Sequence, residues 1–214
     1  MVLVDTNSDW KSSRRAEAVR RIQETAWTIA REQGLAALSL REVARRLGMQ
    51  APSLYSYFAS KNDLYDAMFA RAASELATLV ESLDAELGVR TETAIDVRAS
   101  FKTGARRFAE FCVGDPARFQ LLFQRTIPGF EPSSDSYAPA IRALEMTDRQ
   151  LESMGVHERG HADLWLAILS GLLSQQLSND PGGDRWLGLL DDAVEMFCDH
   201  VDIPPQRRAR RRNG

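Results

Sequence analysis

Residues 39–61, SLREVARRLGMQAPSLYSYFASK, limit the fold most, because they predict two short helices joined by a tight turn. Ser39 can cap the first helix, and Glu42 can return a hydrogen bond to the Ser39 amide, which completes a capping box. Gly48 follows the apolar positions of that helix and tolerates the left-handed backbone that a sharp turn requires. Pro52 suits the first turn of the next helix, where its missing amide hydrogen costs nothing. The segment therefore predicts helix, turn and helix.

The second of these helices has one apolar face and one polar face. Leu54 and Phe58 are four residues apart and are predicted to face inward. The opposite face carries short donors, acceptors and ring hydroxyls, namely Gln50, Ser53, Tyr55, Ser56 and Tyr57. Such groups suit the base edges and phosphate oxygens of a major groove, which admits an α-helix. Either tyrosine alone could equally be a half-buried packing residue, and an ordinary helical hairpin is the alternative for the whole motif.

A third helix is predicted directly after the motif, with Ser60 as its cap and Asp63 at the favourable third position. Lys61 would then lie at the positive end of the helix dipole, where a cation is mildly disfavoured. We therefore expect an anion from outside the chain, such as a DNA phosphate, to compensate Lys61.

These residues resemble the DNA-binding domain of the TetR family of bacterial transcriptional regulators. The resemblance rests on Gly48, on LYSYF at 54–58, on Lys61 and Leu64, and on a first helix that ends at Gly34 and has inward Ala18, Ile22, Ala26 and Ile29. It implies that the helix after the turn lies in the major groove. The base-facing positions implied are Gln50, Ala51, Pro52, Ser53 and Ser56. The phosphate-facing positions implied are Ser39, Tyr55, Tyr57 and Lys61, and Arg41 completes the predicted DNA-binding residues.

Charge is distributed unevenly along the 214 residues. Residues 1–70 carry a net +2 and residues 71–206 a net −10, while the last eight residues hold five arginines, for a total of −3. A less negative N-terminal region on an acidic remainder fits a protein that presents one end to DNA, although a simply acidic cytosolic protein is the alternative. Cys112 and Cys198 lie in apolar helical runs and are expected to be free, buried thiols, as in a reducing compartment. No apolar run reaches membrane-spanning length and no signal peptide is recognisable, so we expect a cytoplasmic protein without a membrane partner.

Helical periodicity continues through the rest of the chain, which predicts an all-α fold. We expect an N-terminal three-helix helix-turn-helix domain at 14–62, a C-terminal helical-bundle domain for effector binding and dimerisation at 63–202, and a disordered basic tail at 203–214. A mobile loop is expected at 126–136, where Pro, Gly and Ser are frequent. Beyond the long helix that leaves the first domain, helices are expected near 92–113, 118–124, 138–154, 158–178 and 184–201.

Residues 115–124 and 165–173 resemble a C-terminal regulatory domain that some TetR-family regulators share, marked by Trp and a His-Gly pair. Ser170 stands here in place of that histidine, before Gly171. An apolar effector pocket is predicted from aromatic residues beside the expected loop, with core packing as the alternative use: Phe101, Phe108, Phe119, Phe123, Tyr137 and Trp165.

The last two helices are apolar on more than one side, which predicts burial against a second copy and hence a homodimer. The predicted interface comprises Leu169, Leu173, Leu177, Trp186, Leu190, Val194 and Phe197. The alternative is that the core of one protomer absorbs all of these side chains. A dimer would hold two recognition helices about 34 Å apart, the spacing of successive major grooves on a palindrome.

The function predicted from these features is a ligand-released repressor of a palindromic operator, with double-stranded DNA, a small apolar effector and a second copy as partners. No cofactor or metal is expected, since His157 and His161 are bracketed by glycines and no glutamate follows in a metalloprotease pattern. The alternatives are an architectural DNA-binding protein without an effector and a helical-bundle enzyme. We expect no enzyme, because the sequence has no phosphate-binding glycine loop and Ser170 lacks the strand that a catalytic serine elbow needs.

Overall fold

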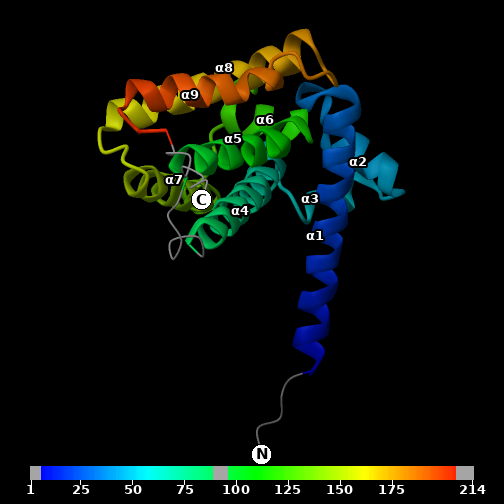
Figure 1. The fold of residues 1–214 in the computed structure, drawn as a ribbon. Coiled ribbons are helices and arrows are strands. Elements are labelled where there is room, and N and C mark those ends of the chain that lie inside the picture. Colours follow the sequence, from blue (N-terminus) through cyan, green and yellow to red (C-terminus); the bar gives the residue numbers. More distant parts are fainter. Residues whose placement is uncertain (1–5, 89–95, 206–214) are drawn as a thin grey trace, which may run out of the picture. The chain divides into compact units, whose positions relative to one another are not determined.

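The computed structural model describes residues 6–88 and 96–205 (Figure 1). Every regular element in these ranges is a helix, which confirms the predicted all-α class. No helix within them is both long enough and apolar enough to cross a bilayer. Residues 206–214, which form most of the predicted basic tail, lie outside the described residues.

The chain divides into two compact units. The first comprises Met1–Ala73 and Ala117–Ala138, and the second comprises Ser74–Pro116 and Pro139–Gly214. This division differs from the predicted boundary after residue 62, because two helices belong to both units. Helix α4 (Lys61–Gly88) and helix α7 (Ser134–Ser153) each begin in the first unit and end in the second.

The first unit contains the predicted helix-turn-helix motif. Its elements are α1 (Thr6–Gln33), a 3-10 turn at Leu35–Ala37, α2 (Leu40–Leu47), α3 (Ala51–Tyr55), the start of α4, and α6 (Pro116–Phe123). Ile22, Ala26 and Ile29 of α1 are at most 1% exposed and face inward as predicted, whereas Ala18 of the same predicted face is half-buried. The backbone at Gly34, which follows α1, has a φ of 84°, a conformation that favours glycine. The buried Tyr65 hydroxyl donates a 2.6 Å hydrogen bond to the Leu35 carbonyl and so joins α4 to this turn.

The start of α7 is attached to α4 within the first unit. The Asp66 carboxylate accepts hydrogen bonds from the Ser133 amide at 2.7 Å, the Ser133 hydroxyl at 2.8 Å and the Ser136 hydroxyl at 2.7 Å. Burial alone would raise the pKa of Asp66, but the bonds from Ser133 and Ser136 outweigh it, so the pKa lies below its ordinary value. The Phe130 ring lies 5.5 Å from the Tyr65 ring. The predicted loop at 126–136 is therefore shorter than expected, because its last three residues are helical.

The second unit is a helical bundle built around α5 (Val97–Val113), α8 (Arg159–Asn179) and α9 (Leu190–His200), with α8 and α9 side by side (Figure 1). Three rings form its centre, since Phe101, Trp165 and Phe197 have pairwise centroid distances of 5.0–5.7 Å. Cys112 and Cys198 are free and buried as predicted, and burial raises the pKa of Cys198 to about 11. Helix α9 begins later than expected, because residues 184–189 form turns and a 3-10 helix.

A buried glutamine shapes the connection between α8 and α9. Gln176 is 2% exposed, and its side-chain oxygen accepts hydrogen bonds from the Trp186 and Leu187 amides at 2.9 and 3.2 Å. Its side-chain nitrogen donates to the carbonyls of Asp180 and Gly183. The side-chain oxygen must face the two backbone amides, because backbone N–H groups can only donate. One side chain thus satisfies four backbone groups of the turn.

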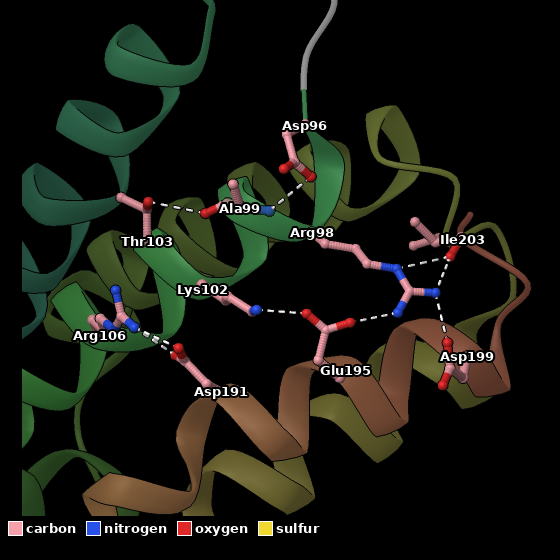
Figure 2. A network of polar contacts seen from close by, with 10 residues as sticks. All are labelled: Asp96, Arg98, Ala99, Lys102, Thr103, Arg106, Asp191, Glu195, Asp199 and Ile203. Carbon is pink, nitrogen blue, oxygen red and sulfur yellow. Dashed lines mark hydrogen bonds and ion pairs between the residues drawn. The ribbon is translucent and has the colours of Figure 1, made fainter. Parts of the chain in front are cut away.

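A buried arginine joins α5 to the C-terminal end of α9 (Figure 2). The Arg98 guanidinium donates to Glu195 at 2.5 Å, to Asp199 at 2.6 Å and, through its Nε, to the Ile203 carbonyl at 3.0 Å. Lys102 forms a second ion pair with Glu195 at 2.5 Å. Lys102 first, and then Arg98, hold the pKa of the Glu195 carboxyl below its ordinary value.

Candidate nucleic-acid interface

The turn between α2 and α3 has the geometry that its sequence predicts. The extended Ser39 caps α2, with its hydroxyl accepting a 3.2 Å bond from the Glu42 amide. Gly48 adopts the left-handed conformation (φ 65°, ψ 24°) and the Met49 amide then bonds back to the Ala44 carbonyl at 2.9 Å. This pattern ends a helix and redirects the chain sharply. Two helices therefore meet at an angle that is set by local backbone chemistry.

The predicted return bond from Glu42 to the Ser39 amide is wrong. The Glu42 carboxylate instead binds Arg45 at 2.7 and 2.8 Å and Arg46 at 3.0 Å. These two guanidiniums, Arg45 more than Arg46, lower the pKa of Glu42 to about 2. The carboxylate is drawn away from the helix terminus because two cations lie one turn further along the same helix.

Helix α3 presents its polar residues to solvent over an apolar support. Leu54 is fully buried and Phe58 is 6% exposed, so both face inward as predicted. The Gln50 side chain makes no capping hydrogen bond, although its residue precedes α3. Its amide is therefore available, as is the exposed Tyr55 hydroxyl. Such a surface can donate to and accept from base edges and phosphates.

None of the ten predicted DNA-binding residues is sealed inside the protomer. The exposed ones are Arg41, Gln50, Pro52, Ser53, Tyr55 and Ser56, and the half-buried ones are Ser39, Ala51, Tyr57 and Lys61. All ten belong to the first unit. Their contacts with DNA stay predictions.

Lys61 has partners inside the chain, which the expectation of an external anion did not include. Its ammonium donates to the Ala36 carbonyl at 3.1 Å and lies 5.2 Å from the centre of the Tyr65 ring. The capping residues behave as predicted, because Ser60 and Asp63 exchange reciprocal hydrogen bonds at 3.0 and 3.1 Å. Lys61 is thereby held beside the motif and keeps donors for a further acceptor.

One contact at the end of α3 was not predicted. Arg15 of α1 donates to the Ser56 carbonyl at 3.1 Å, and its guanidinium lies 5.1 Å from the centre of the Tyr57 ring. The two partners are 41 residues apart, so local spacing could not reveal the contact. The available signal was the frequency of basic residues between Lys11 and Arg21.

The six aromatic residues predicted to line one effector pocket are divided between the two units. Phe101, Phe108 and Trp165 belong to the second unit, where Phe101 and Trp165 are packed in the core. In the first unit, Phe119 and Phe123 have ring centres 5.5 Å apart, and Tyr137 stacks on Phe69 at 5.8 Å. Effector binding by these residues stays a prediction.

Most of the residues predicted at the dimer interface are covered within one protomer. Those that are at most 5% exposed are Leu169, Leu173, Leu190, Val194 and Phe197. Leu177 and Trp186 are half-buried, and the buried Trp186 indole nitrogen has no hydrogen-bond partner among residues 6–88 and 96–205. Their contact with a second copy stays a prediction.

Comparisons with known proteins agree with this site. Residues 22–68, which include α2 and α3, match the family model of bacterial regulatory proteins, tetR family. Over 130 residues the chain is 31% identical to the HTH-type transcriptional regulator Rv1816 of Mycobacterium tuberculosis, covering 58% of this chain and 53% of that protein. It is 30% identical over 93 residues to the HTH-type transcriptional activator FasR of Mycolicibacterium smegmatis, covering 44% of this chain and 39% of that protein. The chain thus matches about half the length of Rv1816 and less of FasR.

Solved structures share the fold at lower identity. The regulatory protein SCO4313 superimposes with a TM-score of 0.68 at 21% identity, over 88% of this chain and 98% of that one. FadR from Bacillus subtilis, solved in complex with stearoyl-CoA, superimposes with a TM-score of 0.57 at 13% identity, over 83% and 96% of the two chains. The helix-turn-helix geometry and the match to the tetR family of bacterial regulatory proteins therefore fall on the same residues, within 22–68.

Proposed function

We propose that this protein is a transcriptional repressor that binds a palindromic operator as a homodimer and is released by a small apolar effector. The observation that carries the proposal is the exposed polar surface of α3, which is supported by buried Leu54 and oriented by the Gly48 turn. That surface lies within the segment that matches the tetR family. An enzyme is the weaker alternative, since relatives with matching motifs are named as regulators.

Selection of duplexes from a random pool with the purified protein tests DNA binding directly. Inverted repeats are expected in the recovered pool, because a two-fold dimer presents two recognition helices to successive major grooves. A pool without enrichment over the input would contradict DNA reading by this chain.

Replacing Gln50 and Ser53 together by alanine is expected to alter sequence preference rather than abolish binding. Removing a bond to a base edge costs about 1–3 kcal/mol at that base pair, while phosphate contacts persist. The measurement is a repeat of the selection, followed by competition binding between the two recovered sequences. Gln33→Ala, at an exposed glutamine in the same unit, is the matched control and should leave the preference unchanged. An unaltered preference in the Gln50/Ser53 variant would show that α3 reads different positions.

Dimerisation is supported by an exposed apolar stripe on α8. Its members are at helical spacing and are exposed or half-buried in the protomer: Leu164, Ala167, Ile168, Gly171 and Leu172. Leu189 and Met196, near and on α9, are 43% and 61% exposed. Two helices that each leave an apolar strip uncovered can bury it against a second copy about a two-fold axis. This stripe lies beside, and not on, the residues that the sequence indicated.

The effector class to test first is an acyl-CoA, whose acyl chain supplies the apolar part although its headgroup is charged, because FadR of Bacillus subtilis has been solved with stearoyl-CoA. A ligand that binds only the folded protein at about a hundred times its Kd stabilises it by about 2.7 kcal/mol. We therefore expect lauroyl-CoA or stearoyl-CoA to raise the melting temperature and to release the selected duplex. Free coenzyme A is the control for the headgroup. Tighter DNA binding with ligand would instead contradict release by the effector.

A further inference from the structure

The first turns of α1 form a helix without a buried face. All eight side chains from Trp10 to Glu17 are exposed, so no apolar stripe packs these turns against the rest of the unit. Figure 1 shows this part of α1 continuing beyond α2 and α3. The family match begins at Ile22, so these turns lie outside the matched domain. We call residues 10–21 the α1 arm. A helix that is polar on all sides is better explained by a polar partner than by the core.

The arm carries positive charge at both ends, with Lys11, Arg14 and Arg15 in its outer turns and Arg20 and Arg21 next to the domain. In the described part of the chain, Lys11, Arg14 and Arg15 form no ion pair with a carboxylate. Arg20 is different, because Glu17 and Glu24 bind it at 2.5 and 2.6 Å. The outer turns therefore present uncompensated charge, whereas Arg20 in the turn next to the domain is neutralised by Glu17 and Glu24.

The arm is continuous with the surface of α3. The bond from Arg15 to the Ser56 carbonyl and its stacking on Tyr57 attach the arm to the end of the recognition helix. A groove of about 610 Å³ lies at this junction, with Trp10, Arg14 and Arg21 of the arm and Tyr57 of the motif among its lining residues. Lys11 lies four residues beyond Arg15, about 6 Å further along the helix axis.

The Trp10 ring restricts the position of the Arg14 guanidinium, which is one of the cations without an ion pair in the described part of the chain. The Arg14 guanidinium lies 4.6 Å from the centre of the Trp10 ring, and Trp10 itself is 57% exposed. Stacking on an indole reduces the conformational freedom of the guanidinium and leaves its donors at the edge, where they can bind a phosphate in bidentate fashion. An arginine held in this way is suited to a backbone phosphate.

We propose that the α1 arm is a second DNA-binding element, which contacts backbone phosphates flanking the bases that α3 reads. The inference rests on the proposed DNA binding of α3. Duplex DNA is the occupant that the observations favour, because the arm is cationic and is joined to the reading surface through Arg15, Ser56 and Tyr57. Its contacts add affinity and length to the footprint without reading sequence.

The test compares two duplexes by fluorescence anisotropy: one limited to the selected sequence and one extended by about one helical turn, about 10 base pairs, at each end. Lys11→Gln with Arg14→Gln removes the free charges and leaves Arg15 in place. We expect this variant to bind the longer duplex about tenfold more weakly than wild type, and its salt dependence to fall by about 0.9 for each phosphate that the arm no longer neutralises. Its affinity for the short duplex should equal that of wild type.

Arg14→Gln and Arg20→Gln form a matched pair, since each removes one charge from the same helix. Only Arg14→Gln should weaken binding to the longer duplex, because Arg20 is engaged by Glu17 and Glu24. The arm would not be a DNA contact if the two substitutions had equal effects, or if the salt dependence of the double variant were unchanged. Binding of the short duplex would still support the proposed function in that case. Failure of wild type to bind either duplex would instead remove the proposed function itself.

Acrylamide quenching of tryptophan fluorescence gives an independent readout. Trp10 is well exposed, whereas Trp27 and Trp165 are each 5% exposed. The difference in quenching between wild type and Trp10→Phe therefore reports on the arm. We expect the longer duplex, but not the short one, to protect Trp10. Undiminished quenching in the longer complex would contradict the proposal. A second result would also contradict the proposal. If the Lys11/Arg14 variant had a lower oligomeric mass than wild type in the absence of DNA, the arm would be contacting a second copy of the chain.

Discussion

Gln176→Leu is expected to lower the free energy of unfolding of the second unit by about 3 kcal/mol, because buried backbone groups that lose their partners cost about 1–3 kcal/mol each. Leucine has a similar volume, so the loss reports hydrogen bonds rather than a cavity. The groups left unpaired are the Trp186 and Leu187 amides and the Asp180 and Gly183 carbonyls. Partial access of water to these groups keeps the expected cost well below their sum.

Chemical denaturation, followed by circular dichroism, measures this loss. Gln175→Leu is the matched control, because Gln175 is exposed on the same helix and its side-chain oxygen accepts a 2.6 Å bond from the side chain of Asn179. That control should change stability by less than about 0.5 kcal/mol, as surface substitutions usually do. Equal effects at positions 175 and 176 would contradict the role assigned to the buried amide.

Arg98→Met is expected to lower the free energy of unfolding by about 2–3 kcal/mol. This loss is smaller than is usual for breaking a buried ion pair, because water can reach the carboxylates of Glu195 and Asp199 once Arg98 is removed. The Arg98 side chain is 9% exposed, whereas those of Glu195 and Asp199 are 42% and 71% exposed. The loss should appear as a lower melting temperature. Arg106→Met is the matched control, since Arg106 is 57% exposed and joins the same two helices through Asp191 at 2.6 Å. An exposed pair of this kind contributes less than about 1 kcal/mol.

The difference between wild type and Arg98→Met should shrink in acid. The folded-state pKa of Glu195 is lowered, chiefly by Lys102 and then by Arg98, so its contribution is fully present above the unfolded pKa of about 4.3. It is lost as the pH falls through the lower folded pKa. Denaturation curves at neutral pH and at successively lower values below about pH 4 measure this change. A constant difference across that range would show that the Glu195 ion pair contributes little.

Features that depend on neighbouring residues were predictable from the sequence. Gly48, Leu54 and Phe58 lie where their spacing indicated, because turn chemistry and helical periodicity act over a few residues. The attachment of Arg15 to Ser56 and that of Ser133 to Asp66 were not predictable, because their partners are 41 and 67 residues apart. Such contacts depend on the tertiary arrangement of whole helices.

Periodicity also could not separate the core of one protomer from a surface between two. Leu173 and Val194 are fully buried in the protomer, although the same apolar pattern indicated an interface. Leu164 and Ile168 lie on the neighbouring face of α8 and remain at least partly exposed. Both faces satisfy helical spacing, and only the packing of α5 and α9 against α8 determines which one is covered.

The bonds from Ser133 and Ser136 to Asp66 attach the start of α7 to α4 within the first unit. Stacking of Tyr137 on Phe69 is a second contact between the same two helices. Asp66→Asn would weaken the polar contact and keep the ring contact, so the junction of α7 with α4 should loosen without being lost.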